Sequence, residues 1–377
     1  MMDASQPMGV TADLAPPSER SREQLNPAPG EPVARRDFVQ ALAPFVTPDT
    51  RAGVLLFCAD YAMFLIGMAM VLWLDNLGLR LLGSVVIGIK MAALYTLAHD
   101  ALHNNLTASR GLNKFLSVLG YLSGFHNYKL RLYDHLVLGH HASLNGAQVD
   151  AYRPMSWQQY RAASPSRKAW ERFTRCLHPL AFGPYCIVSR WLQREVVATP
   201  SMPAQVRAQA WPHTLLVASY LVALLAGLAW RRDGDHWAFV GDALLAVMLP
   251  FFIFQSLTSL ILYFQHTHPQ IPWFAEGDAA QSRYGVDALT VHIQVPRALS
   301  SVTHYILEHP AHHVLPSIPC YRLWDAQRRL YELAPNQSIV VPFSWSLLRD
   351  IMRRCQLYDY EQHRWLDFAG RPTARAG

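Results

Sequence analysis

Four apolar segments, each long enough to cross a lipid bilayer as a helix, constrain the fold of this chain more than any other feature. They cover residues 54–74, 81–98, 214–230 and 243–264. At about 1.5 Å per residue, helices of these lengths are roughly 25–33 Å long, close to the about 30 Å of a hydrocarbon core. The sequence therefore predicts an all-α integral membrane protein with four transmembrane helices. Buried helices of a large soluble protein are the alternative interpretation.

Two charged residues lie inside these segments, Asp60 in the first and Lys90 in the second. A charge at the centre of a bilayer costs about 2.5–3.5 kcal/mol on insertion scales. We therefore expect Lys90 to be buried against another helix. Pro250 lies in the fourth segment and predicts a kink there, because proline removes a helical hydrogen bond.

Lysine and arginine are distributed unevenly around the four segments. Residues 99–212 contain 13 of them and the residues after Phe264 contain 11, whereas the connections 75–80 and 231–242 contain one and two. Basic residues near membrane spans are retained in the cytoplasm. We therefore expect the N-terminal, central and C-terminal parts to lie on the cytoplasmic side, in a bacterial inner membrane.

The chain is predicted to divide into three parts. Residues 1–40 are rich in Pro, Ser and acidic side chains and should form a disordered leader. Residues 41–335 should form the membrane domain with a helical cytoplasmic cap, and residues 336–377 a cytoplasmic C-terminal tail. The short apolar stretches near 115–125 and 177–192 favour interfacial helices along the lipid headgroups, or else the ordinary core of the cap.

Cysteine content and charge argue against two other classes of protein. The five cysteines are widely separated and show no CxxC spacing, so neither a disulfide framework nor a zinc knuckle is indicated. The net charge of +6 fits basic cytoplasmic residues near anionic lipid. No run of Lys and Arg interleaved with stacking aromatics indicates a nucleic-acid groove, so nucleic acid is not an expected partner.

Histidine is concentrated beside the cytoplasmic ends of the apolar segments. His99 and His103 follow the second segment, and His266 and His268 follow the fourth. Because the second and fourth helices cross the bilayer in the same direction, their C-terminal ends emerge on the same face. Ten clustered histidines are thereby predicted to share the cytoplasmic face: His99, His103, His135, His140, His141, His266, His268, His309, His312 and His313.

The spacing of these histidines favours metal coordination. His99 and His103 are four residues apart, so both lie on one face of a helix, and His309, His312 and His313 share a face in the same way. Imidazole is a suitable ligand for iron, and ten imidazoles could surround two ions. An isolated histidine near a membrane is usually only a polar interfacial group. The grouping, rather than any single residue, therefore predicts a metal centre.

These segments resemble a known family, the integral-membrane fatty acid desaturases within the histidine-box desaturase and hydroxylase superfamily. HDALH (99–103) resembles the first histidine box of the family, and HPAHHVLPSIPCYRL (309–323) resembles its third. YFQHTHPQIPWF (263–274) is similar to the segment before the third box in Δ12-type acyl-lipid desaturases. The resemblance extends from about residue 50 to 335.

The resemblance implies a non-haem di-iron centre, held by the ten histidines, that uses O2 to remove hydrogen from an unactivated methylene. Loss of a second hydrogen gives a double bond, whereas rebound gives a hydroxyl. Carboxylates beside metal ligands orient them by accepting their other N–H. Asp100, Asp134 and Glu308 are candidates for this role, and helix capping or solvation explains them equally well. His304, five residues before His309, is a candidate ligand or ligand orienter.

The second histidine box departs from the family pattern. The family usually has HxxHH, whereas here His140 and His141 follow His135 by five and six residues. On an unbroken helix these positions lie roughly 140° and 240° around from His135, so the three rings diverge. A bend at Gly139 would let them converge. Alternatively, His126 or a water molecule replaces His135.

The resemblance implies an acyl chain or related lipid as substrate and an external electron donor. The chain has no Gly-rich dinucleotide fingerprint, so we expect a ferredoxin or cytochrome b5-like protein to supply electrons. A hydroxylase, ketolase or desaturase of a specialised metabolite is the nearest alternative. A metal-binding transporter is more remote, because its ligands would lie within the bilayer.

Overall fold

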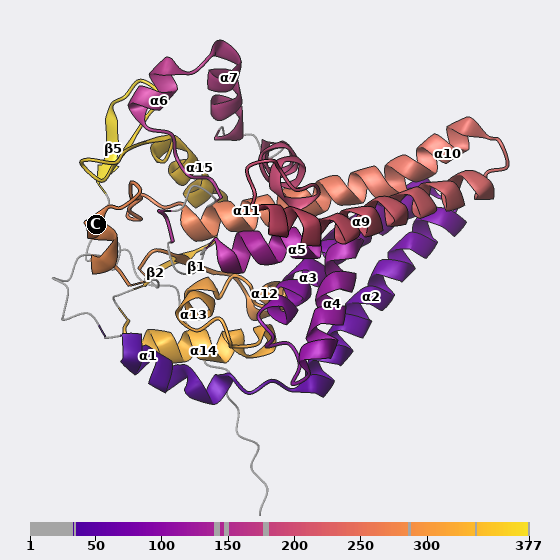
Figure 1. The fold of residues 1–377 in the computed structure, drawn as a ribbon, viewed down its shortest axis with the longest axis horizontal. Coiled ribbons are helices and arrows are strands. Elements are labelled where there is room, and N and C mark those ends of the chain that lie inside the picture. The colour runs from indigo at the N-terminus through magenta and orange to yellow at the C-terminus, as the bar shows by residue number, and fades with distance from the viewer. Residues whose placement is uncertain are drawn as a thin grey trace, which may run out of the picture. The chain divides into compact units, whose positions relative to one another are not determined.

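The computed structural model describes residues 33, 35–138, 144–146, 151–175, 181–285, 288–335 and 338–375. Four helical stretches in it are long and apolar enough to cross a membrane. They are α2 (Thr50–Trp73), α3 (Leu77–Leu102), α9 (Ala204–Arg231) and His236–His266, which consists of α10 (His236–Ala243), a π-helical turn η6 (Leu244–Met248) and α11 (Leu249–His266) (Figure 1). Each predicted segment falls on one of these stretches, so the prediction of a mainly helical membrane protein with four spans is confirmed.

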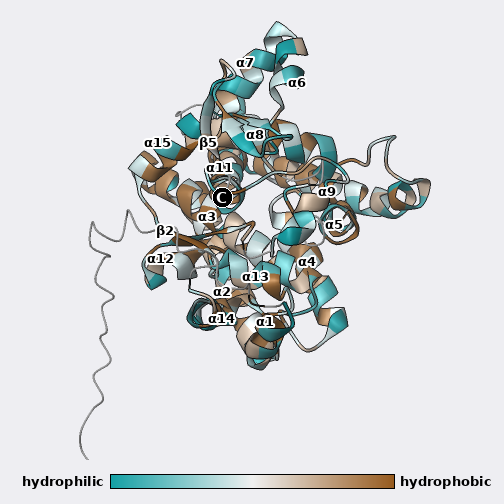
Figure 2. Cartoon of the chain, turned by 90° about the vertical axis from the view of Figure 1, so that its left-hand side faces the viewer, coloured by the Kyte–Doolittle hydropathy of each residue, from teal (hydrophilic) through white to brown (hydrophobic). Residues whose placement is uncertain are grey.

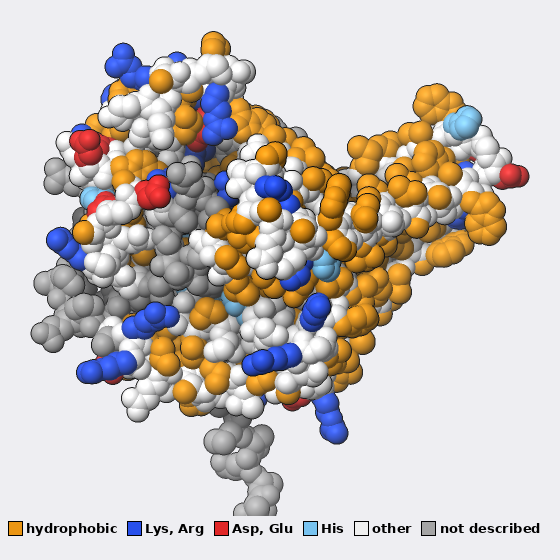
Figure 3. Space-filling view, viewed as in Figure 1, with side chains coloured by type: hydrophobic (Ala, Val, Ile, Leu, Met, Phe, Trp, Pro, Cys, Tyr) orange, Lys and Arg blue, Asp and Glu red, His pale blue; other side chains and the backbone are white. Residues whose placement is uncertain are grey.

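The spanning helices expose apolar side chains on the surface that α2, α9 and α10 share (Figure 3). Ile66 is 50% exposed and Val222 is 66% exposed, as expected for side chains that face lipid. Trp73, Trp230 and Trp237 are exposed beside the two short connections at the far end of the bundle. Tryptophan is enriched at membrane–water interfaces, so these residues mark one boundary of the bilayer.

A buried carboxylate joins the helices at this tryptophan-bearing end. Asp242 in α10 is fully buried. It accepts hydrogen bonds from Arg80 at 2.6 Å and from Arg232 at 2.6 and 2.7 Å. Removing a paired buried charge leaves its partner uncompensated, which is strongly destabilising. The ion cluster therefore fixes α3 relative to the connection between α9 and α10.

The fourth stretch changes its helical pitch just before Pro250. Proline has no N–H, and its ring collides with the carbonyl group four residues earlier in a regular helix. The π-helical turn η6 (Leu244–Met248) ends two residues before Pro250 and widens the backbone at this point. The proline that the sequence places inside the span is thus accommodated by a wider turn.

The predicted leader and interfacial stretches lie partly within the described residues. Residues 1–32 lie outside them, and the end of the predicted leader forms α1 (Arg35–Leu42). The stretch near 115–125 lies mainly in α4 (Arg110–Ser123), which packs so closely on α3 that a Cβ at Gly120 would lie 2.8 Å from the carbonyl oxygen of Leu94. The stretch at 177–192 falls partly outside the described residues. Its described part forms α8 (Phe182–Tyr185) and most of the π-helix η5 (Cys186–Glu195), which pack on α11.

The remaining elements form a cap, by which we mean the described residues within 103–203 and 267–375. Its helices are α4, α5 (Tyr128–Leu132), η3 (Tyr133–Val137), α6 (Trp157–Ala162), α7 (Pro165–Thr174), α8, η5, η7 (Ala279–Arg283), α12 (Arg297–Val302), α13 (His309–Val314), α14 (Cys320–Leu333) and α15 (Trp345–Arg354). Hydrophilic residues are prominent on α6 and α7 (Figure 2).

Two small sheets add to the helical cap. Strand β1 (Val291–Gln294) pairs in parallel with β2 (Ile339–Pro342). Strands β3 (Leu357–Asp359), β4 (Arg364–Leu366) and β5 (Pro372–Arg375) form an antiparallel sheet. The segment that we expected to be a tail therefore contains ordered elements, and Trp365 is fully buried in a hydrophobic cluster with Tyr263 and Phe264 at the end of α11.

Candidate metal centre

Seven histidines converge in two groups at the junction of the spanning helices and the cap. The first cluster contains His99, His103, His135 and His312, and the second cluster contains His266, His309 and His313. Within each cluster the ligand nitrogens lie within 4.8 Å of one another. Six of the seven side chains are buried, and His103 is half-buried. The structure thus brings together segments that are more than 200 residues apart in the sequence.

The first cluster is built from three elements. His99 lies in the last turn of α3 and His103 is the residue that ends it. The Nε2 atom of His135, in η3, lies 2.8 Å from Nε2 of His99 and 3.0 Å from Nε2 of His103. The ring of His312, in α13, lies 4.8 Å from that of His99 and 5.2 Å from that of His103.

The second cluster is built from two elements. His266 is the last residue of α11, and its Nε2 atom lies 3.0 Å from Nε2 of His309 in α13. One turn further along α13, Nε2 of His313 lies 2.9 Å from Nε2 of His309. The three ring centroids are separated by 4.3 to 5.4 Å.

These distances fit a bound transition metal. With a metal–imidazole bond of about 2.1 Å, two ligands at right angles have nitrogens about 3.0 Å apart. The Nε2 atoms of His135 and His309 each face two other Nε2 atoms at 2.8 to 3.0 Å. A single ring N–H donates one good hydrogen bond, whereas a shared cation attracts all three lone pairs. The donor sets therefore suit metal ions better than histidine–histidine hydrogen bonds.

Helix α13 divides its three histidines between the clusters. His309 and His313, one turn apart, contribute to the second cluster, whereas His312 contributes to the first. The ring of His312 lies 5.9 Å from that of His309 and 5.7 Å from that of His313. We expected one helical face to present all three histidines to neighbouring metals. The structure adds that this one short helix contributes histidines to both clusters.

The unusual spacing of the second box coincides with a π-helix. Tyr133–Val137 form η3, whose wider turn contains His135 and orients it into the first cluster. His126, the alternative ligand, is directed elsewhere. Its Nδ1 lies 2.7 Å from the carbonyl oxygen of Gly124 and its Nε2 lies 2.9 Å from Glu195. The geometry therefore supports His135 rather than His126.

Three other predicted ligands are not placed in either cluster. His140 and His141 lie outside the described residues. His268 belongs to neither cluster within the described chain. Burial, together with the positive charge of Arg354, lowers the pKa of His268 to about 4. Its backbone carbonyl accepts a hydrogen bond of 3.1 Å from the indole of Trp365, so this segment is anchored to β4.

Of the predicted acidic neighbours, Asp100 contacts a clustered ring. Its Oδ1 lies 3.6 Å from Nδ1 of His99, and its Oδ2 accepts a hydrogen bond of 2.5 Å from the backbone N–H of Cys320. Glu308 accepts from Ser300 at 2.8 Å and lies 2.5 Å from Nε2 of His292. Asp100 therefore ties the end of α3 to the cap, and Glu308 ties the start of α13 to other parts of the cap.

Asp134 belongs to a buried ion network instead. Its carboxylate lies 3.3 Å from Arg131 and 3.2 Å from Arg190, and Arg131 also contacts Glu195 at 2.7 Å. Burial alone would raise the pKa of Glu195, but Arg131, His126 and Arg190 hold it well below its usual range. No local pattern indicates this network as a whole, because its members come from three separate elements.

His304 binds a carboxylate within the membrane domain. Its Nε2 lies 2.5 Å from Oδ2 of Asp60, and Oδ1 of Asp60 lies 2.6 Å from Nζ of Lys90. Lys90 is half-buried and pairs with Asp60 on α2, so the expected contact with another helix is present. One sequence signal could have predicted this pair: Asp60 lies 13 residues before the end of α2 and Lys90 lies 13 residues after the start of α3. In a hairpin of two membrane-spanning helices, residues at equal distances from the turn lie at the same depth in the membrane.

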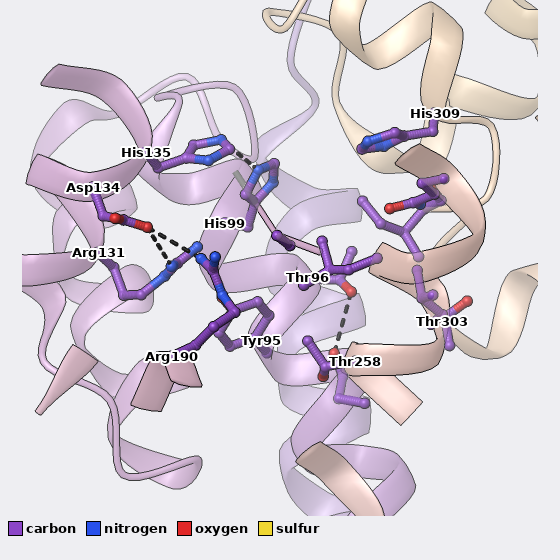
Figure 4. Close-up of a pocket in the computed structure, with 16 residues that line it drawn as sticks. Tyr95, Thr96, His99, Arg131, Asp134, His135, Arg190, Thr258, Thr303 and His309 are labelled. Carbon is purple, nitrogen blue, oxygen red and sulfur yellow. Dashed lines mark hydrogen bonds and ion pairs between the residues drawn. The ribbon is translucent and has the colours of Figure 1, made fainter. Parts of the chain in front are cut away.

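A pocket with about 820 Å³ of empty space, part of it open to solvent, adjoins both clusters. Figure 4 shows His99 and His135 directed toward each other on one side and His309 on the other. Seven of the 16 lining residues are apolar residues and threonines from α3, α11 and the segment before α13, namely Ala92, Thr96, Thr258, Ile261, Leu262, Thr303 and Ile306. Arg131, Asp134 and Arg190 lie at one end.

Comparison with known proteins agrees with this geometry. A family model described as fatty acid desaturase matches residues 76–345, which include both clusters. The chain is 24% identical over 392 residues to an omega-6 fatty acid desaturase, chloroplastic, of Brassica napus, with 94% of this chain and 80% of the relative covered. It is 25% identical over 283 residues to an sn-1 oleoyl-lipid 12-desaturase of Synechocystis sp., with 73% and 74% covered. An sn-1 acyl-lipid omega-3 desaturase (ferredoxin) of Synechocystis sp. is 25% identical over 240 residues, with 61% of each chain covered. The chain therefore belongs to the fatty acid desaturase family and is an oxidoreductase.

Proposed function

We propose that the two clusters hold two iron ions and that the protein desaturates the acyl chain of a membrane lipid at the cytoplasmic face of a bacterial inner membrane. The observation that supports this most directly is the convergence of seven imidazoles in two groups beside one largely apolar pocket. When bound, the irons would supply O2 activation and hydrogen abstraction, for the overall reaction RCH2–CH2R + O2 + 2 e⁻ + 2 H⁺ → RCH=CHR + 2 H2O.

The pocket wall binds and orients the hydrocarbon. Ala92 and Thr96 on α3 face Ile261 and Leu262 on α11 across the cavity, so methylenes replace water there. His99, His135 and His309 also line the cavity, and a bound methylene therefore lies beside both clusters. Water exclusion at this point limits side reactions of the activated oxygen.

Charged and polar neighbours hold the imidazoles in place. Asp100 contacts Nδ1 of His99, which favours the tautomer that leaves Nε2 free to bind metal. We also retain His140 and His141 as proposed ligands, because they follow His135 within a few residues. Asp134, His304 and Glu308 are proposed to position ligand-bearing segments through their ion pairs rather than to touch the metals.

The relatives support the substrate class and the donor. Two of them are named for oleoyl-lipid or acyl-lipid substrates, and one is named with ferredoxin. We therefore assign an acyl-lipid substrate and a one-electron donor such as ferredoxin or a cytochrome b5-like protein. The excess of basic residues in the cap supports a site on the cytoplasmic side.

Product analysis tests this function. The gene is expressed in a host that lacks it, and total lipid acyl chains are compared by mass spectrometry with those from a His309→Ala variant. Desaturation removes two hydrogen atoms, whereas a hydroxylase would add one oxygen atom. Iron is measured in the purified wild-type protein. Zinc without iron, or wild-type lipids identical to those of the variant, would refute the proposal.

A further inference from the structure

Helix α15 (Trp345–Arg354) has two chemically different faces. Leu348, Ile351 and Met352 are buried. Beside this buried face, Trp345, Arg349 and Arg353 are exposed and follow one another at four-residue intervals, so they form one stripe. Trp345 is 65% exposed, which is unusual for so large an aromatic side chain. We call these three residues the α15 stripe.

The buried face of α15 belongs to a hydrophobic cluster that extends to the last turn of α11, which ends at His266 of the second cluster. Leu348, Ile351 and Met352 belong to the same hydrophobic cluster as Tyr263 and Phe264, which precede His266 on α11. The helix therefore joins an exposed surface to the segment that ends in a metal-binding histidine.

A second connection runs through the C-terminal sheet. Trp365 in β4 is fully buried in this hydrophobic cluster, and its indole N–H donates to the carbonyl oxygen of His268 at 3.1 Å. One residue, Thr267, separates His268 from His266 in the chain. Packed side chains and one hydrogen bond thus lead from α15 to the second cluster without crossing the lipid-facing part of the molecule.

The location of the stripe favours a water-soluble partner. Helix α15 lies at the end of the described unit opposite the α9–α10 connection, where the exposed tryptophans mark a bilayer boundary (Figure 1). The family match ends at residue 345, so all but the first residue of α15 lies beyond it. Arg349 and Arg353 therefore lie outside the matched region, and Trp345 is its last residue.

Its charge favours an acidic partner. Asp350, the acidic residue of α15, is paired with Arg354 at 3.2 Å. Among the described residues, no acidic side chain lies within ion-pairing distance of Arg349 or Arg353. Exposed arginines beside an exposed tryptophan are the residue types that dominate protein-binding hot spots.

We infer that the α15 stripe is the docking surface for an acidic one-electron carrier protein, which delivers electrons to the second cluster. This inference rests on the proposed function. Each double bond requires two electrons and two protons in addition to the two hydrogens of the substrate. Two reduced carriers therefore dock in turn and leave oxidised, solvent supplies the protons, and O2 is reduced to two molecules of water.

Charge reversal tests the surface. The purified, iron-loaded protein is assayed with a plant-type [2Fe–2S] ferredoxin that NADPH and its reductase keep reduced. At about 50 mM salt, R349E/R353E should raise the KM for ferredoxin by about tenfold or more and leave the maximal rate near that of the wild type. At about 0.5 M salt the difference should disappear, because charges on exposed surfaces are then screened. Trp345→Ala should raise the KM at both salt concentrations.

The matched control is R161E/R328E, which reverses two exposed arginines on α6 and α14 of the same cap. The inference is overturned if this control raises the KM as much as R349E/R353E, or if R349E/R353E leaves it unchanged. It is also overturned if R349E/R353E raises the KM for ferredoxin only in vesicles that contain anionic lipid, since the stripe would then bind the membrane.

A donor-free assay separates this inference from the proposed function. Iron content is measured, and a single turnover is started with protein reduced by dithionite. If wild-type protein makes no double bond under these conditions, the proposed function fails. If wild-type and R349E/R353E proteins both make it and have the same KM for ferredoxin, only the docking surface is refuted. Should R349E/R353E lose iron, R349Q/R353Q replaces it in the same comparison.

Discussion

The two histidine clusters have similar nitrogen geometry but are assembled in different ways. The second cluster needs only the end of α11 and one turn of α13, with His309 and His313 at regular helical spacing. The first cluster takes its residues from α3, α13 and the π-helix η3, where regular spacing fails. A site built from regular helices is visible in a sequence, whereas a site that depends on a widened turn is not.

The clusters also differ in what surrounds them. The second cluster adjoins the hydrophobic cluster around Trp365, and the first adjoins the ion network of Arg131, Asp134 and Glu195. Apolar packing is not screened by salt, whereas ion pairs depend on pH and on their partners. Helix α13 is the element shared by both clusters, so perturbations there should affect the two together.

Substitution of ligands on α13 should have the largest effect. His309→Ala removes the ring that faces both His266 and His313, and His312→Ala removes a ring of the first cluster. We expect each variant to lose at least about 100-fold in turnover, since even outer ligand-orienting residues cost 10–100-fold. Iron per chain, measured on protein purified from membranes, should fall in both. Full iron content in either variant would show that the residue is not a ligand.

The next prediction concerns the irregular second box. His135→Ala should lower turnover by about 100-fold and lower iron content, because Nε2 of His135 faces two nitrogens of the first cluster. His126→Ala should retain iron, because its ring contacts Glu195 and Gly124 instead. The reverse result, with iron lost only in His126→Ala, would restore the alternative ligand set. Metal analysis of both purified variants decides between them.

A third prediction concerns the segment before α13, on which both clusters depend. His304 and Tyr305 have positive φ angles of 53° and 58°, which cost roughly 1–3 kcal/mol each, and the Asp60–His304 contact holds them. Asp60→Asn should lower the free energy of unfolding by about 3–5 kcal/mol, because Lys90 is left charged and uncompensated.

Its control is the double variant Asp60→Asn/Lys90→Met, which removes both charges and should recover a substantial part of this loss. Thermal unfolding of the three proteins in detergent measures the effect. Equal stability of the wild type and Asp60→Asn would contradict the assigned ion pair.

The smallest expected effect is confined to the second cluster. Trp365→Phe keeps the aromatic packing but removes the N–H that bonds to His268, a loss of about 1 kcal/mol. We expect a few-fold lower affinity for iron at the second cluster and unchanged coordination at the first. Mössbauer spectra of iron-57-loaded protein should show one altered and one unaltered signal. Equal changes in both signals would mean that the two clusters do not have separate supports.

The sequence allowed the spans and much of the site to be predicted because these depend on local patterns. Segment length and hydropathy located all four helices. The second and fourth helices cross the membrane in the same direction, which predicted that His99, His103 and His266 lie on one face. By contrast, the contact between Asp60 and His304 joins residues 244 positions apart, and no local pattern indicates it.

Two other features required the three-dimensional structure. The assignment of His312 and His313 to different clusters depends on what lies beside each face of α13. The inward orientation of His135 depends on the π-helical turn, which regular helical periodicity does not anticipate. The interfacial roles proposed for residues 115–125 and 177–192 stay predictions.

The length of α3 has a consequence for how a substrate enters. From Leu77 to His99 the helix rises about 33 Å along its axis, slightly more than the about 30 Å hydrocarbon layer. An acyl tail must therefore withdraw part of its length from the bilayer before a methylene lies beside the imidazoles. Transfer of a methylene from water into an apolar site is favourable by about 0.8 kcal/mol. An acyl chain that moves from lipid into an equally apolar cavity gains almost none of this free energy. Discrimination between acyl chains consequently depends on the bends and the length of each chain rather than on its hydrophobicity.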